Sequence, residues 1–291
     1  MAKKRKRKGT NIGILDYEFK RKSARLLFQS AKQVGKAEKL DLHNVCLVGE
    51  NGLSYLHKST NEMDVILPRF STWLYSFGMI AVKHFEHQGI PVVNGSKCIE
   101  LCQNKYYTSL ALKKRNIAQP NFAISLSSKL LKKHVSHMRF PVVLKLLHGT
   151  EGIGTLKADD WSQVRDWIET LGELHRIVYV QDYLHHQEDF RLFVVGDEVL
   201  YGYKKILANK EWKSNNHYGA KVEKIKITRQ LRNFALKCAA AVKAEVCAVD
   251  YTMLDQTPYV MELNQAPDFS NSFKMNIGKK IVDFCRKKAR R

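Results

Sequence analysis

The sequence predicts an α/β (α+β) protein that begins with a parallel α/β lobe and ends with antiparallel strands. Its 291 residues, of which 44% are hydrophobic, are enough for two or three lobes that each have a core. Strand and helix patterns alternate over residues 11–95, which is typical of a parallel sheet. In the last third of the chain, short strands are joined by tight turns, which favour antiparallel pairing.

The N-terminal lobe is predicted over residues 11–95 from the spacing of its apolar residues. The segment NIGILD at residues 11–16 indicates a first buried strand, and residues 21–34 have apolar side chains at helical spacing. The other predicted elements of this lobe are strands at 45–48 and 65–67, a helix at 73–87, and a turn into a further strand at 89–93.

The central segment, residues 96–180, is predicted to combine helices with strands. A helix pair is expected over residues 97–115, with Lys105 in its middle. Pro120 and the serine-rich residues 125–128 mark a turn and a helix start. Beyond them the pattern predicts a strand from residue 142, an amphipathic helix at 161–171 and a strand at 177–181.

One stretch of this segment, VVLKLLHGTEGIGT at residues 142–155, indicates a ligand site. Lys145 lies inside an apolar strand, and an unpaired buried ammonium group is costly. A polyanion explains it if Lys145 meets one phosphate and the amides of the glycine loop surround the others. The alternative is a lysine that reaches the surface before a hairpin turn. The loop is not a Walker A motif, and no helix follows it as a dinucleotide fingerprint requires.

The C-terminal lobe, residues 181–285, is predicted to be built from hairpins. Its expected elements are strands at 190–195 and 198–203 around Gly196-Asp197, a helix at 230–243, and strands at 246–254 and 259–263. The last two strands each place a carboxylate, Asp250 or Glu262, inside an apolar run, and Asn264 follows on the same face as Glu262. These oxygen ligands suit magnesium or manganese. Separate salt bridges to lysines are the alternative.

The formal net charge of +21 predicts polyanionic partners such as nucleic acid, nucleotides or carboxylate-rich substrates. Six positive charges lie in residues 3–8 and five in residues 286–291, which leaves +10 on the rest of the chain. Residues 1–10 and 286–291 are therefore expected to be basic, disordered tails. They either contact RNA or the ribosome, or keep the protein in solution.

Neither a membrane span nor a signal peptide is visible in the sequence. The six cysteines lack paired CxxC spacing and are expected to be free thiols in a reducing compartment. A cytoplasmic protein without membrane contact is expected.

Several segments in order along the chain resemble the ATP-grasp superfamily, and within it the RimK-type amino-acid ligases. The resemblance extends from about Ile66 to Phe269. It is carried by VLKLLHGTEGIG (143–154), EDFRLFVVGDEV (188–199), WKSNNHYGA (212–220), and residues 73–94, 104–120, 248–253 and 261–267. It implies three lobes, with ATP bound between a central lid and the C-terminal lobe.

The resemblance also implies roles for individual residues. It implies that Lys105 and Lys145 contact the phosphates of ATP, with the loop glycines Gly152 and Gly154 beside them. The hinge residues Asp182 and Tyr183 would lie against the adenine, and Asp189 would lie near the ribose. Further residues near the phosphates would be Lys213, Ser214 and Asn215. It implies that two Mg²⁺ or Mn²⁺ ions are held by Asp250, Glu262 and Asn264.

The implied reaction is an ADP-forming ligation of a carboxylate to an amine through an acylphosphate. Such a site positions its reactants and offsets negative charge, which is why lysines and metal-binding carboxylates dominate it. Arg191 and Lys205 are candidates for stabilising the tetrahedral intermediate or holding a substrate carboxylate. Arg191 is alternatively a structural ion-pair partner. His217 is either a substrate contact or a loop histidine.

The sequence departs from the family pattern in three places. Asp182 stands at the hinge where relatives more often have Glu. Tyr218-Gly219-Ala220 stands where the family tends to have Arg-Gly-Gly, and Ala266-Pro267-Asp268 replaces Ser-Pro-Gly. Tyr218 and Asp268 therefore put the recognition of the substrate carboxylate and amine in doubt, whereas the ATP and metal residues are intact.

The resemblance favours addition of an amino acid, glutamate first, to a protein C-terminus or a coenzyme carboxylate, by a chain that forms a homo-oligomer. One alternative is an RNA- or ribosome-associated ATP-binding protein with an ATP-grasp body. Another is an ATP-grasp macrocyclase that acts on a peptide.

Overall fold

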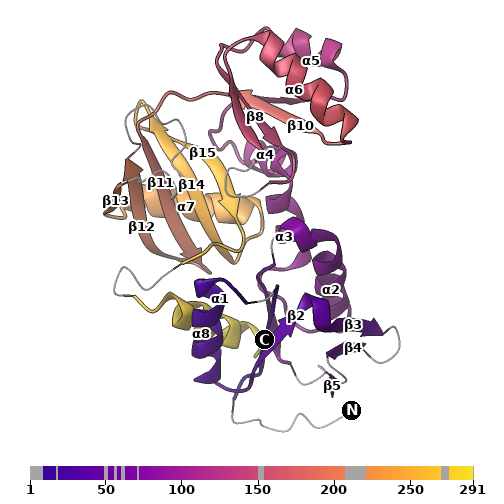
Figure 1. Cartoon of the computed structure of the whole chain (residues 1–291). Coiled ribbons are helices and arrows are strands. Elements are labelled where there is room, and N and C mark those ends of the chain that lie inside the picture. The colour runs from indigo at the N-terminus through magenta and orange to yellow at the C-terminus, as the bar shows by residue number, and fades with distance from the viewer. Residues whose placement is uncertain are drawn as a thin grey trace.

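The chain folds into three lobes, which lie one above another in Figure 1. A computed structural model describes residues 9–17, 19–48, 52–55, 58–59, 63–70, 72–149, 154–206, 221–269 and 275–290. The N-terminal lobe is at the bottom of the view, the C-terminal sheet is in the middle, and the lid is at the top. The predicted arrangement, a parallel N-terminal sheet followed by antiparallel sheets, is confirmed.

The N-terminal lobe is built on a parallel sheet with helices on both faces. Its strands, in the order β2-β1-β6, are β1 (Ile12–Asp16), β2 (Ala37–Asp41) and β6 (Val65–Pro68). Helix α1 (Lys22–Lys32) covers one face, and α2 (Tyr75–His87), which follows the short 3₁₀ turn Thr72–Leu74, covers the other. All five residues of β1 are buried, as their apolar sequence predicts.

Two features of this lobe differ from the sequence-based expectation. Strand β2 was not expected because its sequence, AEKLD, is polar, and the structure makes it an edge strand with one buried residue. The expected strand at residues 45–48 is not part of the parallel sheet. It is β3 (Val45–Val48), which follows the 3₁₀ turn Leu42–Asn44 and forms a separate antiparallel sheet with β4 (Gly52–Tyr55) and β5 (Lys58–Ser59). No helix separates these strands, and parallel neighbours need such a crossover.

The lid is a four-stranded antiparallel sheet covered by two helices. Its strands, in the order β7-β10-β8-β9, are β7 (Phe122–Ile124), β8 (Val142–Leu146), β9 (Thr155–Ala158) and β10 (Val178–Asp182). The covering helices are α5 (Ser128–Val135) and α6 (Trp161–Glu173). The predicted helix start among the serines is confirmed, because Ser127 accepts a hydrogen bond from the backbone amide of Leu130 and caps α5.

The C-terminal lobe is a five-stranded antiparallel sheet in the order β13-β12-β11-β14-β15. Its strands are β11 (Glu188–Val195), β12 (Glu198–Ile206), β13 (Lys221–Lys224), β14 (Val246–Leu254) and β15 (Thr257–Asn264). Helix α7 (Arg229–Ala241) covers one face. The predicted helix pair is present as α3 (Ser96–Gln103) and α4 (Lys105–Lys114), and Leu112 of α4 joins the core between α7 and this sheet. Helix α4 therefore packs on the C-terminal lobe as well as leading into the lid.

The C-terminal helix α8 (Ile277–Lys288) returns to the N-terminal lobe and packs against α1. Residues 286–288 were expected to be part of a disordered tail, but they form the last turn of this helix. The physical reason is the apolar stripe Ile277, Ile281, Val282 and Cys285, which is buried in the core shared by the two lobes.

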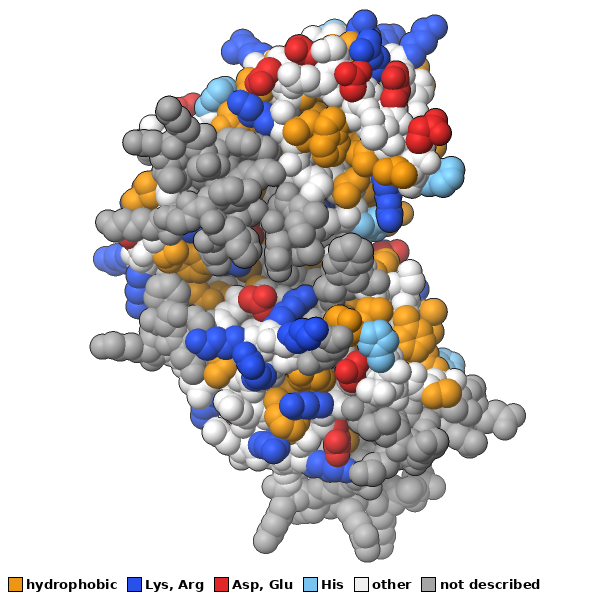
Figure 2. Space-filling view, viewed as in Figure 1, with side chains coloured by type: hydrophobic (Ala, Val, Ile, Leu, Met, Phe, Trp, Pro, Cys, Tyr) orange, Lys and Arg blue, Asp and Glu red, His pale blue; other side chains and the backbone are white. Residues whose placement is uncertain are grey.

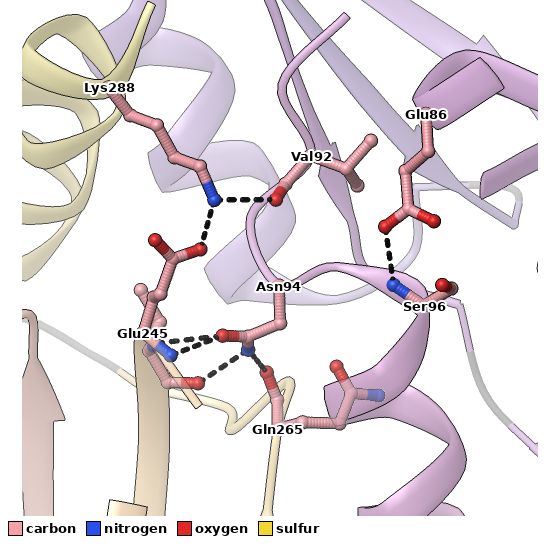
Figure 3. Close-up of polar contacts among 8 residues, drawn as sticks. Glu86, Val92, Asn94, Ser96, Glu245, Gln265 and Lys288 are labelled. Atoms are coloured by element: carbon pink, nitrogen blue, oxygen red, sulfur yellow. Dashed lines mark hydrogen bonds and ion pairs between the residues drawn. The ribbon is translucent and has the colours of Figure 1, made fainter. Parts of the chain in front are cut away.

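Asn94 joins the N-terminal lobe to the C-terminal lobe (Figure 3). Its amide nitrogen donates to the carbonyl oxygens of Val246 (2.6 Å) and Gln265 (2.7 Å), and its oxygen accepts from the backbone amides of Glu245 (2.7 Å) and Val246 (3.0 Å). Lys288 adds an ion pair with Glu245 and a hydrogen bond to the carbonyl of Val92. These contacts attach the two lobes to each other directly.

Basic side chains gather on the N-terminal lobe. In Figure 2, Lys and Arg side chains lie across the lower half of the face on which Figure 1 shows α1. The exposed basic residues of the segment 20–39 are Lys20, Lys22, Arg25, Lys32, Lys36 and Lys39. All six cysteines are free thiols, as expected. Among the helices of the described residues, none is both long and apolar enough to cross a membrane.

Candidate active site

The C-terminal sheet places charged side chains on one face because strand side chains alternate. Arg191 on β11 pairs in register with Tyr203 on β12 and Asp250 on β14, and Asp250 pairs with Glu262 on β15. The residues that share this face are Asp189, Arg191, Lys205, Asp250 and Glu262. The apolar residues between them point the other way, towards α7. At one end the sheet joins the core shared with α1 and α8, and Glu262 lines a cleft together with residues of the lid.

A cleft between the lid and the C-terminal sheet brings several predicted residues together. It is lined by residues from α4, β8, β10 and β15, which include Lys105, Ser109, Lys145, Tyr179, Gln181 and Glu262. Lys105 begins α4, and its ammonium group donates to the carbonyl of Gly149 at 3.2 Å. Burial and the nearby positive charge of Lys105 lower the pKa of Lys145 to about 8, although Glu262 and Asp189 oppose the shift. The ammonium groups of Lys105 and Lys145 therefore bring positive charge to this partly buried cleft.

Gln181 is a site residue that sequence reasoning missed. It lies on β10 next to the expected hinge, is 4% exposed and lines the cleft. Its amide nitrogen is buried and has no hydrogen-bond partner within the described residues. A buried donor without a partner is uncommon and indicates a ligand or water in the cleft. The signal in the sequence was a glutamine that ends an otherwise apolar strand.

The three predicted metal ligands lie on the neighbouring strands β14 and β15, and Asp250 is already paired with another side chain. Asp250 and Glu262 are cross-strand neighbours, and Glu262 is exposed and makes no ion pair with any described residue. Arg191 donates to both oxygens of Asp250, at 2.5 and 2.6 Å, so its ion-pair interpretation is the one that the structure shows. Burial lowers the pKa of Arg191, but the charge and hydrogen bonds of Asp250 outweigh this and raise it. The oxygen donor set fits Mg²⁺ or Mn²⁺.

Two other predicted ATP residues, Asp182 and Tyr183, have partners of their own. Asp182 ends β10 and accepts hydrogen bonds from the backbone and side-chain nitrogens of Asn121 at 3.3 and 2.7 Å. The ring of Tyr183 contacts His185 edge to face, and Lys157 lies 5.8 Å from its centre. These contacts hold the segment between β10 and β11, which connects the lid to the C-terminal sheet.

Asp189 has a neighbour that the sequence did not indicate. His186 lies with Nε2 2.8 Å from Oδ1 of Asp189 and Nδ1 2.6 Å from the carbonyl of Leu184. Burial lowers the pKa of His186, but the hydrogen bond and charge of Asp189 outweigh it, so that the pKa is raised. Lys205 pairs in register with Asp189, and burial and Arg191 lower the pKa of Lys205.

Gly154 closes the glycine loop at the start of β9. Its φ of +70° is in the left-handed region, and an added Cβ would lie 2.5 Å from Cδ1 of Leu146. Its carbonyl accepts a hydrogen bond of 2.9 Å from the amide of Leu146. The predicted residues Gly152, Lys213, Ser214, Asn215, His217 and Tyr218 lie outside the described residues. Asp268 lies in the segment after β15, where it contacts Ser23 and Arg69 of the N-terminal lobe.

Solved structures of ATP-grasp enzymes share this fold. The ATP-grasp ligase PsnB in complex with a minimal precursor matches with a TM-score of 0.74 and 15% identity over 97% of this chain and 99% of that one. A RimK domain protein from Sphaerobacter thermophilus matches with a TM-score of 0.72 and 18% identity over 95% of this chain and the whole of the other. D-alanine–D-alanine ligase from Bacillus anthracis matches with a TM-score of 0.69 and 17% identity, over 96% of this chain and 97% of that one.

The protein is an ATP-grasp ligase. The sequence profile of the RimK-like ATP-grasp domain matches residues 102–285. A protein of Trichodesmium erythraeum named "probable alpha-L-glutamate ligase" is 30% identical over 239 residues, which are 80% of each chain. One of the same name from Rhodopirellula baltica is 28% identical over 94% of this chain and 70% of its own length. The chain belongs to the RimK-like ATP-grasp family, which confirms the resemblance.

Proposed function

We propose that the protein joins an amino acid, with L-glutamate the first candidate, to the carboxylate of a protein C-terminus or a coenzyme. The observation that carries this proposal is the charged face of the C-terminal sheet opposite Lys105 and Lys145 in one cleft. The relatives named as probable alpha-L-glutamate ligases support glutamate as the added amino acid.

ATP occupies the cleft in this proposal, with its phosphates at Lys105 and Lys145 and its base near Gln181, Asp182 and Tyr183. The lysines offset the negative charge that must gather when a carboxylate approaches the γ-phosphate. In this proposal Asp189, which His186 contacts, binds the ribose. The loop residues Gly152, Gly154, Lys213, Ser214 and Asn215 complete the contacts with the nucleotide.

Asp250, Glu262 and Asn264 would hold two Mg²⁺ or Mn²⁺ ions. When bound, such ions offset the charge of the phosphates and orient them. Arg191 keeps the carboxylate of Asp250 in a fixed orientation, because its guanidinium group binds both oxygens. Lys205 remains the candidate for contact with a substrate carboxylate or the tetrahedral intermediate.

Isotope labelling tests the identity of the product. The protein is incubated with ATP, Mg²⁺, ¹³C-labelled L-glutamate and a cell extract depleted of small molecules, and the protein and coenzyme fractions are analysed by mass spectrometry. The proposal predicts label in one fraction, at a chain end or on a coenzyme carboxylate. ADP formation with no label in either fraction would contradict it, and a peptide that loses the mass of one water without gaining label would favour a macrocyclase.

A second candidate function, association with RNA or the ribosome, is favoured by the basic side chains of residues 20–39 (Figure 2). Such binding would weaken steeply with salt, because phosphate contacts release counterions. Glu262→Gln separates the two functions, since it is expected to abolish ligation and to leave RNA binding unchanged. RNA binding without ADP formation in any condition would favour the second function.

A further inference from the structure

We propose that the outer face of the lid docks on the same face of a second copy of this chain, with α5 of each copy against α6 of the other. This face, the lid surface, consists of the exposed residues of segments 126–140 and 159–174, which contain the two helices and their ends. The contact is between identical surfaces, so a two-fold axis relates the copies and every interaction occurs twice.

The lid surface lies on the side of the lid sheet that is turned away from the cleft. Leu144 and Val180 of the sheet are buried in one core with α5 and α6. Lys145, Tyr179 and Gln181, which are next to them along the strands, line the cleft. Because strand side chains alternate, the helices and the cleft lie on opposite faces of this sheet. A second copy on the helices therefore leaves the cleft open, and the inference goes beyond the proposed ligase site.

Three leucines of the lid surface lie in solvent. Leu126, just before the cap of α5, is 85% exposed, Leu130 in the first turn of α5 is 61% exposed, and Leu174 at the end of α6 is 63% exposed. By contrast, Leu131 on the inward side of α5 is buried. Covering exposed leucine side chains removes apolar area from water, which favours a partner.

The two helices of the lid surface have opposite charges. Residues 126–140 contain four Lys or Arg and no Asp or Glu, whereas residues 159–173 contain five Asp or Glu and one Arg, so that the formal charges are +4 and −4. Charged side chains of both signs are visible on the lid at the top of Figure 2. A surface with a basic helix beside an acidic one complements itself after a two-fold rotation. A uniformly acidic or basic partner would be repelled by one of the helices.

The charges on the outer sides of α5 and α6 are not used within the lid. Lys129 and Lys133 are one turn apart on α5, and Glu169 and Glu173 are one turn apart on α6. All four are exposed, and none of them makes an ion pair with a described residue. Like charges at this spacing repel each other, and Glu173 lies at the C-terminal end of its helix, where the macrodipole disfavours a negative charge. Docking of Lys129 and Lys133 on Glu169 and Glu173 of a second copy offsets both effects.

Sedimentation velocity of the full chain, over a range of protein concentrations and at low and high salt, tests the inference. Two variants reverse the charge of one helix each. The basic-helix variant is Lys129→Glu with Lys133→Glu, and the acidic-helix variant is Glu169→Lys with Glu173→Lys. Each variant is measured alone and in an equal mixture with the other.

Two further variants accompany them. Arg229→Glu with Arg232→Glu is the matched control, since it reverses two exposed charges on α7 of the C-terminal lobe. Leu130→Ser removes apolar area from the lid surface without changing its charge. Circular dichroism and ATP binding are measured on every preparation, and neither should change, because the substituted side chains are exposed and lie away from the cleft.

The expected result is a dimer of wild type that dissociates more readily at high salt. Each of the two lid charge-reversal variants should raise the dissociation constant about 100-fold or more, because like charges then face each other at both symmetric contacts. Their mixture should dimerise again, since the reversed α5 of one meets the reversed α6 of the other and the unchanged helices meet each other. Leu130→Ser should weaken the dimer about 10-fold, and the α7 control should behave as wild type.

Three results would overturn the inference. The first is a wild type that stays monomeric at every concentration. The second is an assembly that both lid charge-reversal variants form as well as the α7 control does, which would place the contact between copies elsewhere. The third is a mixture of the two variants that remains dissociated, which would show that α5 of one copy does not face α6 of the other.

Discussion

Arg191 on β11 and Asp250 on β14 lie directly opposite each other and share two hydrogen bonds of 2.5 and 2.6 Å. The side chains are 22% and 21% exposed, so the pair is shielded from solvent on most sides. Asp250 is in turn the cross-strand neighbour of the exposed Glu262. The arginine thus fixes the orientation of one carboxylate of the proposed metal site, while the second remains free to accept an ion.

Replacing Arg191 by Met should lower the rate of ADP formation about 10- to 100-fold and raise the Mg²⁺ concentration needed for half-maximal activity, because Asp250 loses the group that orients it. Initial rates over a Mg²⁺ titration measure both effects. Lys204→Met is the matched control, since Lys204 lies on the other face of β12 and pairs with Glu188 and Glu223. An unchanged Mg²⁺ requirement in Arg191→Met would show that Asp250 needs no orienting partner.

The pKa of Lys145, lowered to about 8, predicts a pH dependence for ATP binding. Phosphates bind the charged form, so ATP raises this pKa, and above pH 8 the free protein must take up a proton on binding. The dissociation constant for ATP should therefore rise as the pH increases beyond about 8, with a limiting uptake of about one proton. Isothermal titration calorimetry in buffers of different ionisation enthalpy measures the uptake. Lys145→Arg should abolish it, because arginine keeps its charge.

Substituting Gly154 by Ala should destabilise the lid by about 1–2 kcal/mol and weaken ATP binding, since a side chain is strained at positive φ. The added Cβ would also lie 2.5 Å from Cδ1 of Leu146. Thermal unfolding and ATP titration measure the two effects. Gly172→Ala in α6 is the control, because a Cβ added there would have no atom within 4 Å and the φ of Gly172 is not in the left-handed region. Equal behaviour of the two variants would contradict the role of the turn.

Asn94→Asp should destabilise the protein by about 3 kcal/mol or more, because two buried carbonyls lose their donor and face a carboxylate instead. Urea unfolding followed by circular dichroism measures the change. Asn116→Asp is the control, since Asn116 is exposed and Asp tolerates its positive φ. A destabilisation no larger than that of Asn116→Asp would mean that the lobes are attached to each other elsewhere.

The fold followed from the sequence wherever apolar spacing was decisive, as in the buried β1 and the helices α6 and α7. It did not follow for β2, whose edge position needs few apolar residues. Helix α8 was not predicted, and its basic last turn was assigned to a disordered tail, although the helix carries an apolar stripe that the N-terminal lobe covers. Sequence distance also concealed the lobe contact of Asn94, whose partners lie about 150 residues away.

The carboxylate pair Asp250 and Glu262 was predictable, because each interrupts an apolar strand and alternation fixes its face. The pairing of Asp250 with Arg191 was not predictable, because it depends on β11 lying beside β14 in the sheet. Only that strand order decides whether Arg191 is an ion-pair partner or a contact of the substrate or intermediate. Gln181 and His186 were missed for a related reason. Their significance comes from burial and from the groups around them, which spacing along the chain does not contain.

Amino-acid-dependent ADP release tests the central claim most directly. Wild type and Glu262→Gln are incubated with ATP, Mg²⁺ and each of the twenty amino acids, with and without a depleted cell extract, and Glu198→Gln serves as a surface control. We predict that one amino acid stimulates ADP release in the presence of the extract, and that Glu262→Gln reduces the rate about a hundredfold or more. A rate in Glu262→Gln equal to wild type, or no stimulation by any amino acid in the presence of bound ATP, would contradict the account.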